Sequence, residues 1–67
     1  MTNLKRQREA AGMSQGGLAK ASGVSVRVIQ SYEAGARDIN KAQGITLHQI
    51  AKALGCTMEQ LLELDAE

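Results

Sequence analysis

The sequence contains no proline, tryptophan or phenylalanine, and its one aromatic residue is Tyr32. Without proline, the chain lacks the residue whose fixed backbone and missing N–H most often interrupt a helix. Without other aromatic side chains, a hydrophobic core has to be built from Leu, Ile, Val, Ala and Met. Strong helix formers are abundant, so the composition favours an all-α fold. A chain of 67 residues is expected to form one domain, residues 1–67.

The sequence is also poor in residues that cross-link a chain, bind metals or enter a membrane. Cys56 has no second cysteine with which to form an internal disulfide, and Cys and His are too few for a zinc site. The longest apolar runs are too short to span a membrane, and residues 1–12 lack the apolar stretch of a signal peptide. We therefore expect a cytoplasmic protein with no metal, no cofactor and no membrane partner.

No arrangement typical of an enzyme is present. The segment "GGLAKASG" lacks the Gly-Lys-Ser/Thr ending of a phosphate-binding loop. His48 falls on a polar helix face without a nearby acid and nucleophile. We interpret Cys56, which follows a helix-stopping glycine, as a small buried residue rather than a nucleophile. No enzymatic activity is expected.

Charge is unevenly distributed along the chain, although the formal net charge is only +1. Residues 1–41 carry seven basic and three acidic side chains, whereas residues 42–67 carry one basic and four acidic side chains. This asymmetry is typical of a protein with one surface for a polyanion. An ordinary solvated surface with an acidic C-terminal tail explains it equally well.

Capping residues, glycines and apolar spacing predict five helices. Ser14 and Ser25 are candidate N-caps, and Gly23 lies where a left-handed residue commonly ends a helix. Thr57, followed three residues later by Gln60, has the pattern of a capping box. The predicted helices span Asn3–Ala11, Gln15–Ser22, Val26–Ala34, Asn40–Leu54 and Met58–Leu64.

Two of these helices carry expectations about burial. In the second helix, the residues expected to face inward are Leu18, Ala19 and Ala21. In the fourth helix, Ile45 falls near the polar side of the helical wheel. Either Gly44 distorts the helix there, or Ile45 is an exposed apolar contact.

The third helix separates into two faces. Val28, Ile29 and Tyr32 form an apolar face suited to a core. The opposite face presents Val26, Arg27, Gln30 and Ser31. Arginine pairs with guanine, glutamine with adenine, and an apolar side chain with the thymine methyl group in the major groove of DNA. The second helix, the link "GVS" and the third helix therefore predict a helix-turn-helix at residues 14–34.

The segments "LKRQREAAGMSQ", "LAKASGVS", "IQSYEAG" and "IAKALGCTMEQLL" together resemble the Cro/repressor-type (XRE-like) helix-turn-helix family of bacteria and phages, over residues 4–62. The resemblance implies a compact five-helix, lambda-repressor-like domain. It also implies sequence-specific binding of double-stranded DNA by a transcriptional regulator. We expect a repressor that acts as a dimer on a palindromic operator and is associated with the nucleoid when bound.

The resemblance also assigns roles to residues. Base contacts are expected from Val26, Arg27, Gln30 and Ser31, and contacts with the DNA backbone from Gln15, Ser25, Arg37 and Lys41. Arg8 and Glu33 match a pair that forms an internal ion pair in the family. The alternatives are that Ser25 acts only as a cap and that Arg37 and Lys41 are ordinary surface charge.

Several alternatives remain open at this point. The chain is either a complete small repressor or a fragment of a longer one. A second hypothesis is an antitoxin that binds a toxin protein and its own promoter. A third is a helical protein-interaction module. Candidates for a dimer surface are Ile45, Leu64 and the C-terminal helix. Gly16 and Gly17 either are tolerated in the first turn of the second helix or allow that turn to approach a phosphate closely.

Overall fold

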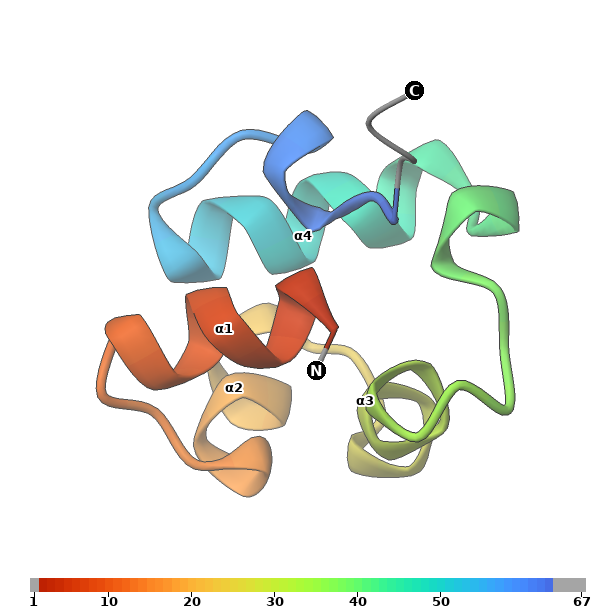
Figure 1. Ribbon diagram of the computed structural model, residues 1–67. Helices are drawn as coiled ribbons and strands as arrows, with labels where there is room; N and C mark the ends of the chain where they lie inside the picture. Colours follow the sequence, from red (N-terminus) through yellow and green to blue (C-terminus); the bar gives the residue numbers. More distant parts are fainter. Residues whose placement is uncertain (1, 64–67) are drawn as a thin grey trace.

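The computed structural model describes residues 2–63, which form helices and turns and contain no strand. The α-helices are α1 (Asn3–Ala10), α2 (Gln15–Ser22), α3 (Val26–Glu33) and α4 (Gly44–Leu54), and two 3₁₀ turns are η1 (Ile39–Lys41) and η2 (Glu59–Leu61). The all-α prediction is confirmed for this part of the chain (Figure 1). Within the same residues, every helix is too short or too polar to cross a membrane.

Side-chain caps begin α2 and α3 at the predicted places. The Ser14 hydroxyl accepts a hydrogen bond from the Gly17 N–H at 2.9 Å, and the Ser25 hydroxyl accepts one from the Arg27 N–H at 3.2 Å. Each cap satisfies one of the N–H groups that the first turn of a helix leaves without a partner. Gly23 ends α2 with a φ of 75°, in the left-handed region that a residue with a Cβ adopts only at a cost.

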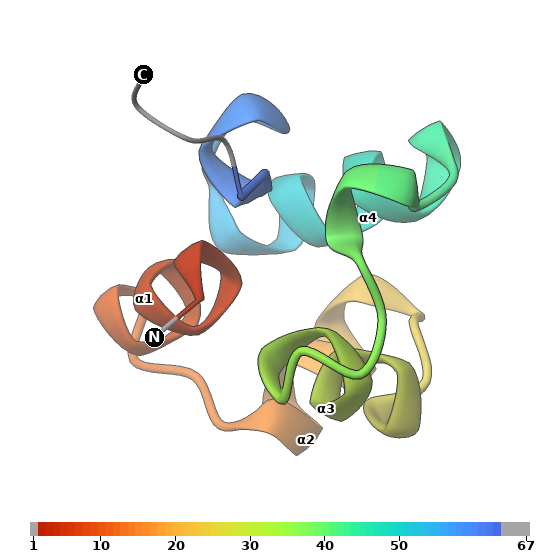
Figure 2. The same ribbon diagram turned by 45° about the vertical axis from the view of Figure 1, so that its right-hand side comes forward.

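The core is aliphatic apart from Tyr32, and each main element contributes one fully buried side chain to it. These residues are Leu4 of α1, Leu18 of α2, Ile29 of α3, Ile50 of α4 and Leu61 of η2. Helix α2 packs on both α3 and α4, while α1 packs on α3 and η2 (Figures 1 and 2). Burial of each such side chain contributes about 1.5–3 kcal/mol. This packing leaves the outer side of α3 and the first turn of α2 facing solvent.

Small differences from the prediction occur in the first three helices. Helices α1 and α3 each end one residue earlier than expected, because Ala11 and Ala34 serve as C-caps. The expectation that Ala21 faces inward is wrong: Ala21 is exposed and the neighbouring Ser22 is buried. The Ser22 hydroxyl is satisfied there, since it accepts a hydrogen bond from the Val24 N–H at 3.2 Å.

The predicted start of the fourth helix at Asn40 is also wrong. Helix α4 begins at Gly44, and the preceding Ala42 and Gln43 are extended. Residues 39–41 form the separate turn η1, in which the Asp38 carboxylate accepts a hydrogen bond from the Asn40 N–H at 2.9 Å. Ile39 of this turn is buried in the core. Ile45 is 60% exposed in the first turn of α4, which identifies it as an exposed apolar residue.

The predicted fifth helix, Met58–Leu64, is reduced to the single turn η2 in the described residues, and Leu64 lies outside them. The capping box is present: the Thr57 N–H donates to Gln60 Oε1 at 2.8 Å, and the Gln60 N–H donates to Thr57 Oγ1 at 3.2 Å. The chain then becomes extended at Leu62.

Two asparagines explain why η2 does not continue as a helix. The Asn3 side-chain amide donates to the Leu62 carbonyl at 2.7 Å. Asn40 donates to the Glu63 carbonyl at 2.9 Å and accepts from the Glu63 N–H at 2.8 Å. These side chains take the backbone groups that a longer helix would use internally.

Candidate nucleic-acid interface

Helix α3 is anchored on one side and open on the other. Ile29 and Tyr32 are buried, whereas Val26 is 39% exposed and Arg27 and Gln30 are exposed. The exposed side therefore presents a guanidinium, a carboxamide and a small apolar surface along a helix of eight residues. A helix of this size, held by its inner face, fits the width of the DNA major groove.

Ser31 differs from its neighbours on this face because it is half-buried and its hydroxyl is engaged. Its Oγ donates to the Arg27 carbonyl at 2.9 Å, which leaves the oxygen lone pairs as the free hydrogen-bonding capacity. The Ser31 carbonyl accepts from the N–H groups of Ala36 and Arg37 at 2.9 and 3.2 Å. Ser31 therefore also holds the start of the segment that follows α3.

Gln15, the first residue of α2, lies between two side chains of α3. Its Nε2 donates to Glu33 Oε1 at 3.0 Å, and its Oε1 accepts from Gln30 Nε2 at 3.3 Å. The sequence places Gln15 and Gln30 separately in the candidate site, but it does not predict that they are in contact. The one available signal is the spacing of Gln30 and Glu33, which puts both on the same side of α3.

Arg8 and Glu33 form a buried ion pair behind this contact. Arg8 Nε donates to Glu33 Oε2 at 2.7 Å and Arg8 Nη2 donates to Glu33 Oε1 at 3.1 Å, with the two side chains 11% and 5% exposed. Arg8 Nη1 donates to the Met13 carbonyl at 2.8 Å. The pair thereby connects α1, the link after it and the end of α3.

The charge state of Glu33 follows from these contacts. Burial raises the pKa of its carboxyl, but hydrogen bonds from Arg8 and Gln15 and the positive charges of Arg8 and Lys5 outweigh burial. The net effect lowers the pKa of Glu33 below its ordinary value of 4.5. Glu33 is therefore an ionised, acceptor-only group at neutral pH.

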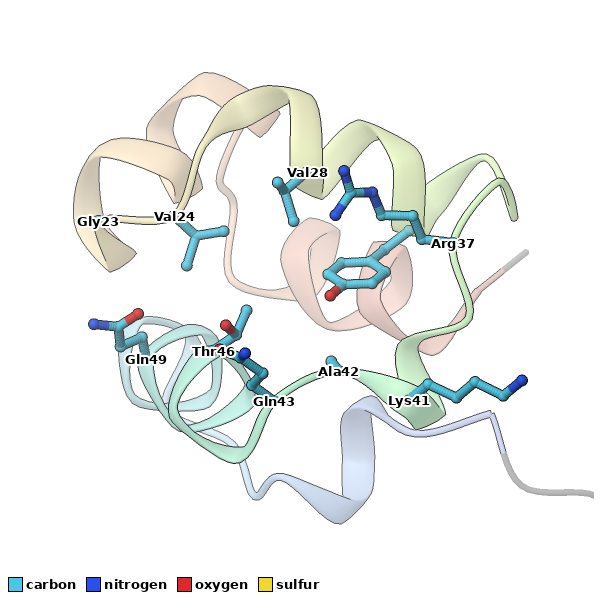
Figure 3. A pocket seen from close by; sticks show the side chains of 10 residues that line it. Gly23, Val24, Val28, Arg37, Lys41, Ala42, Gln43, Thr46 and Gln49 are labelled. Atoms are coloured by element: carbon cyan, nitrogen blue, oxygen red, sulfur yellow. The ribbon is translucent and has the colours of Figure 1, made fainter.

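A cavity of about 490 Å³ borders α3 on the side away from Gln15. Its lining comes from the α2–α3 turn, α3, the segment before α4, and α4: Gly23, Val24, Val28, Tyr32, Arg37, Lys41, Ala42, Gln43, Thr46 and Gln49. In Figure 3 the Arg37 side chain turns toward Val28, while Lys41 extends away from the other lining residues. Both cations are exposed, and none of the described residues that line this cavity is acidic.

The two glycines of α2 occupy different surroundings. A Cβ added at Gly16 would meet no atom within 4 Å, whereas one at Gly17 would lie 3.1 Å from the Ser14 hydroxyl oxygen. Both glycines are exposed in the first turn of α2. The small size of Gly16 is therefore not required by any neighbour within the protein.

Two features of residues 2–63 concern metal and thiol chemistry. These residues contain no group of three His, Cys, Asp or Glu side chains that could hold a metal ion. Cys56 is half-buried rather than buried as expected, and burial raises the pKa of its thiol. A thiol with a raised pKa is a poor nucleophile at neutral pH.

Comparison with known protein families gives a match. A family model described as Helix-turn-helix, from the Cro/repressor-type (XRE) group, matches residues 4–61. The matched region runs from α1 through η2. No curated protein and no solved structure matches the chain.

Proposed function

As the chain belongs to the Cro/repressor-type helix-turn-helix family, a family of DNA-binding transcription regulators, we propose that α2 and α3 form its helix-turn-helix and that it binds a specific double-stranded DNA sequence. The observation that carries this proposal is the exposed side of α3. Arg27 and Gln30 stand free of the core there, while Ile29 and Tyr32 anchor the helix. Helix α3 enters the major groove, and α2 crosses the DNA backbone.

Each residue on the exposed side of α3 has a role set by its chemistry. Arg27 donates two hydrogen bonds to guanine, and Gln30 pairs with adenine. Val26 contacts a thymine methyl group. Ser31 accepts a hydrogen bond from a base, because its own hydroxyl proton is engaged by the Arg27 carbonyl.

Contacts with the DNA backbone flank this helix. Arg37 and Lys41 are exposed in the segment between α3 and α4 and neutralise phosphates from that side. Ser25 and Gln15 lie at the N-termini of α3 and α2, where N–H groups favour an anion. Because Gln15 already binds Glu33 and Gln30, its remaining capacity for a phosphate is its second Nε2 proton.

The chain acts as a repressor, and two copies bind a palindromic operator. One helix of eight residues contacts too few base pairs to select a single site in a genome. A symmetric dimer doubles the number of bases that are contacted, with half-sites separated by about one turn of DNA. Ile45 is the candidate for an apolar dimer contact, because it is 60% exposed on α4.

The experiment that tests this proposal is selection of bound sequences from a random pool of double-stranded DNA. Enrichment of a palindromic consensus supports both sequence recognition and dimer binding. A consensus without symmetry supports recognition and contradicts the dimer. Absence of any enrichment contradicts DNA recognition and favours a protein partner.

Arg27→Ala and Arg37→Ala form a matched pair, because both remove an exposed guanidinium near α3. Arg27→Ala is expected to cost about 1–3 kcal/mol on the selected site and to relax base choice at one position. Arg37→Ala is expected to weaken binding to all sequences alike and to lower the slope of log affinity against log salt by about one. Equal loss on selected and random DNA for Arg27→Ala would reassign it to the backbone, and an unchanged salt slope would remove Arg37 from the backbone contacts.

A further inference from the structure

We propose that Glu33 fixes the orientation of the Gln15 side-chain amide, and that Gln15 in turn holds Gln30 in the one orientation suited to adenine. Gln15 and Glu33 are then positioning residues for base recognition, in addition to any contact of Gln15 with phosphate. The inference rests on the proposed function, because Gln30 has to face a base for the orientation to matter.

The direction of the chain of hydrogen bonds is set at Glu33. The ionised carboxylate can only accept, and it already binds two N–H groups of Arg8. Gln15 therefore has to turn its NH₂ group toward Glu33, where Nε2 lies 3.0 Å from Oε1. This leaves the Gln15 carbonyl oxygen facing α3.

The same reasoning fixes Gln30. The Gln15 carbonyl oxygen can only accept, so Gln30 has to turn its own NH₂ group toward Gln15, at 3.3 Å. One N–H and the carbonyl oxygen of Gln30 remain free. Adenine presents one acceptor and one donor in the major groove, and this pair of free groups is complementary to it. If the amide turned over, its carbonyl oxygen would face that of Gln15, and the contact would be lost.

Burial explains why the arrangement starts from Glu33 rather than from the exposed end. The Glu33 side chain is only 5% exposed, so water competes little for it, and both of its oxygens are engaged by protein donors. Gln15 is half-buried and Gln30 is exposed. The buried Glu33 carboxylate thus orients Gln15, and Gln15 orients the exposed Gln30. Fixing a side chain before binding removes part of the entropy cost of binding.

A double-mutant cycle on the selected DNA site tests the inference. The variants are Gln15→Ala, Gln30→Ala and the double variant, with folding of each checked by circular dichroism. If Gln15 acts through Gln30, the affinity loss from Gln15→Ala should shrink by at least about threefold when Gln30 is already alanine. Gln15→Ala alone should also broaden base choice at the position read by Gln30.

The matched control is the cycle of Gln15→Ala with Arg27→Ala. Arg27 lies on the same face of α3 and has no side-chain hydrogen bond to Gln15 in residues 2–63. The affinity loss of this double variant should therefore equal the product of the two single losses to within about twofold. Two results together would overturn the inference while leaving the proposed function intact. The first is that the affinity losses of Gln15→Ala and Gln30→Ala multiply in the double variant. The second is that base choice is unchanged in Gln15→Ala. Failure of the wild-type protein to select any DNA would overturn both.

A measurement on the free protein separates the hydrogen bonds from DNA binding. The side-chain amide proton signals of Gln30 in an NMR spectrum should shift in Gln15→Ala and should stay in place in Arg27→Ala. Unchanged Gln30 signals in both variants would show that the two glutamines are not coupled, and would overturn the inference without reference to DNA.

Discussion

Replacement of Glu33 by glutamine tests the ion pair that connects α1 to the end of α3. The new amide has the shape of the carboxyl but carries no charge, and one of its two ends is an NH₂ group. Both carboxylate oxygens of Glu33 accept from Arg8, so the NH₂ group of the glutamine faces an N–H of Arg8 in either orientation of the amide. The variant therefore loses at least one hydrogen bond and leaves a guanidinium that is only 11% exposed without a counter-charge.

The size of the effect follows from these losses. Removing one partner of a buried ion pair costs about 3–5 kcal/mol in general. Arg8 keeps its hydrogen bond to the Met13 carbonyl and lies near the surface of a small domain, so we expect the lower end, about 3 kcal/mol. A domain of this size has a total stability of about 3–10 kcal/mol, and 3 kcal/mol lowers the melting temperature by about 12–24 °C.

The pH dependence of stability provides a second test, because it shows whether ionised Glu33 stabilises the fold. The pKa of Glu33 is lower in the folded than in the unfolded protein, so ionisation of Glu33 stabilises the fold above its ordinary value of 4.5. That contribution disappears as the pH falls through the lowered pKa of the folded state. The difference in stability between wild type and Glu33→Gln should thus be full at pH 7 and should shrink progressively below about pH 4.5.

Urea denaturation followed by circular dichroism at pH 7 and at low pH measures both quantities. The control is the double variant Arg8→Met/Glu33→Leu, which removes both charges and keeps apolar volume. It should be closer to wild type than Glu33→Gln is, because no buried charge is left unpaired. A loss below about 1 kcal/mol in Glu33→Gln, or a double variant as unstable as the sum of its single variants, would refute the reasoning.

Three further predictions concern backbone and thiol positions. Gly16→Ala should stabilise the domain by about 0.5 kcal/mol, since a Cβ there meets no atom within 4 Å. Gly17→Ala should stabilise it less, because its Cβ would lie 3.1 Å from the Ser14 hydroxyl oxygen. Urea denaturation compares the two variants, and equal gains in stability would contradict the role of the Ser14 cap. Gly23→Ala should cost about 1–2 kcal/mol in the same assay because φ is 75°, and no loss would show that the turn relaxes. Burial raises the pKa of Cys56, so a thiol reagent at pH 8 should label it more slowly in the native protein than in urea, and equal rates would contradict its shielding.

Local signals account for the parts of the fold that were predicted well. Ser14 and Ser25 lie next to the helices that they cap, and Gly23 lies at the end of the helix that it terminates. Such interactions join residues two to four positions apart, so their residue types are readable from one sequence. The bounds of α2 were therefore predicted to the residue, and α3 was predicted to within one.

Long-range contacts account for the parts that were predicted poorly. The predicted fourth helix starts too early because residues 39–41, with Ile39 in the core, form the separate turn η1, and Ala42 and Gln43 after it are extended. The predicted fifth helix stops short because Asn3 and Asn40 bind backbone groups of residues 62 and 63. Nothing in the local sequence of residues 58–63 shows that two distant asparagines lie beside it.

The candidate site also has a part that local sequence predicts and a part that depends on contacts between distant residues. The exposed side of α3 follows from helical periodicity, which separates Arg27 and Gln30 from Ile29 and Tyr32. Arg8 and Glu33 were named only through the resemblance, because a single sequence does not place two residues from different helices together. The contacts of Gln15 with Glu33 and Gln30 were missed for the same reason.

The asparagine contacts at η2 also bear on how the chain can be re-engineered. The Asn3 amide lies 2.7 Å from the Leu62 carbonyl, so residues near the two ends of the described range, 2–63, meet at one place. A short flexible linker from residue 63 to residue 2 should therefore join them without strain, and the exposed segment at residues 34–38 can be opened to give new ends. Such a circular permutant would keep both asparagine contacts within one continuous stretch of chain.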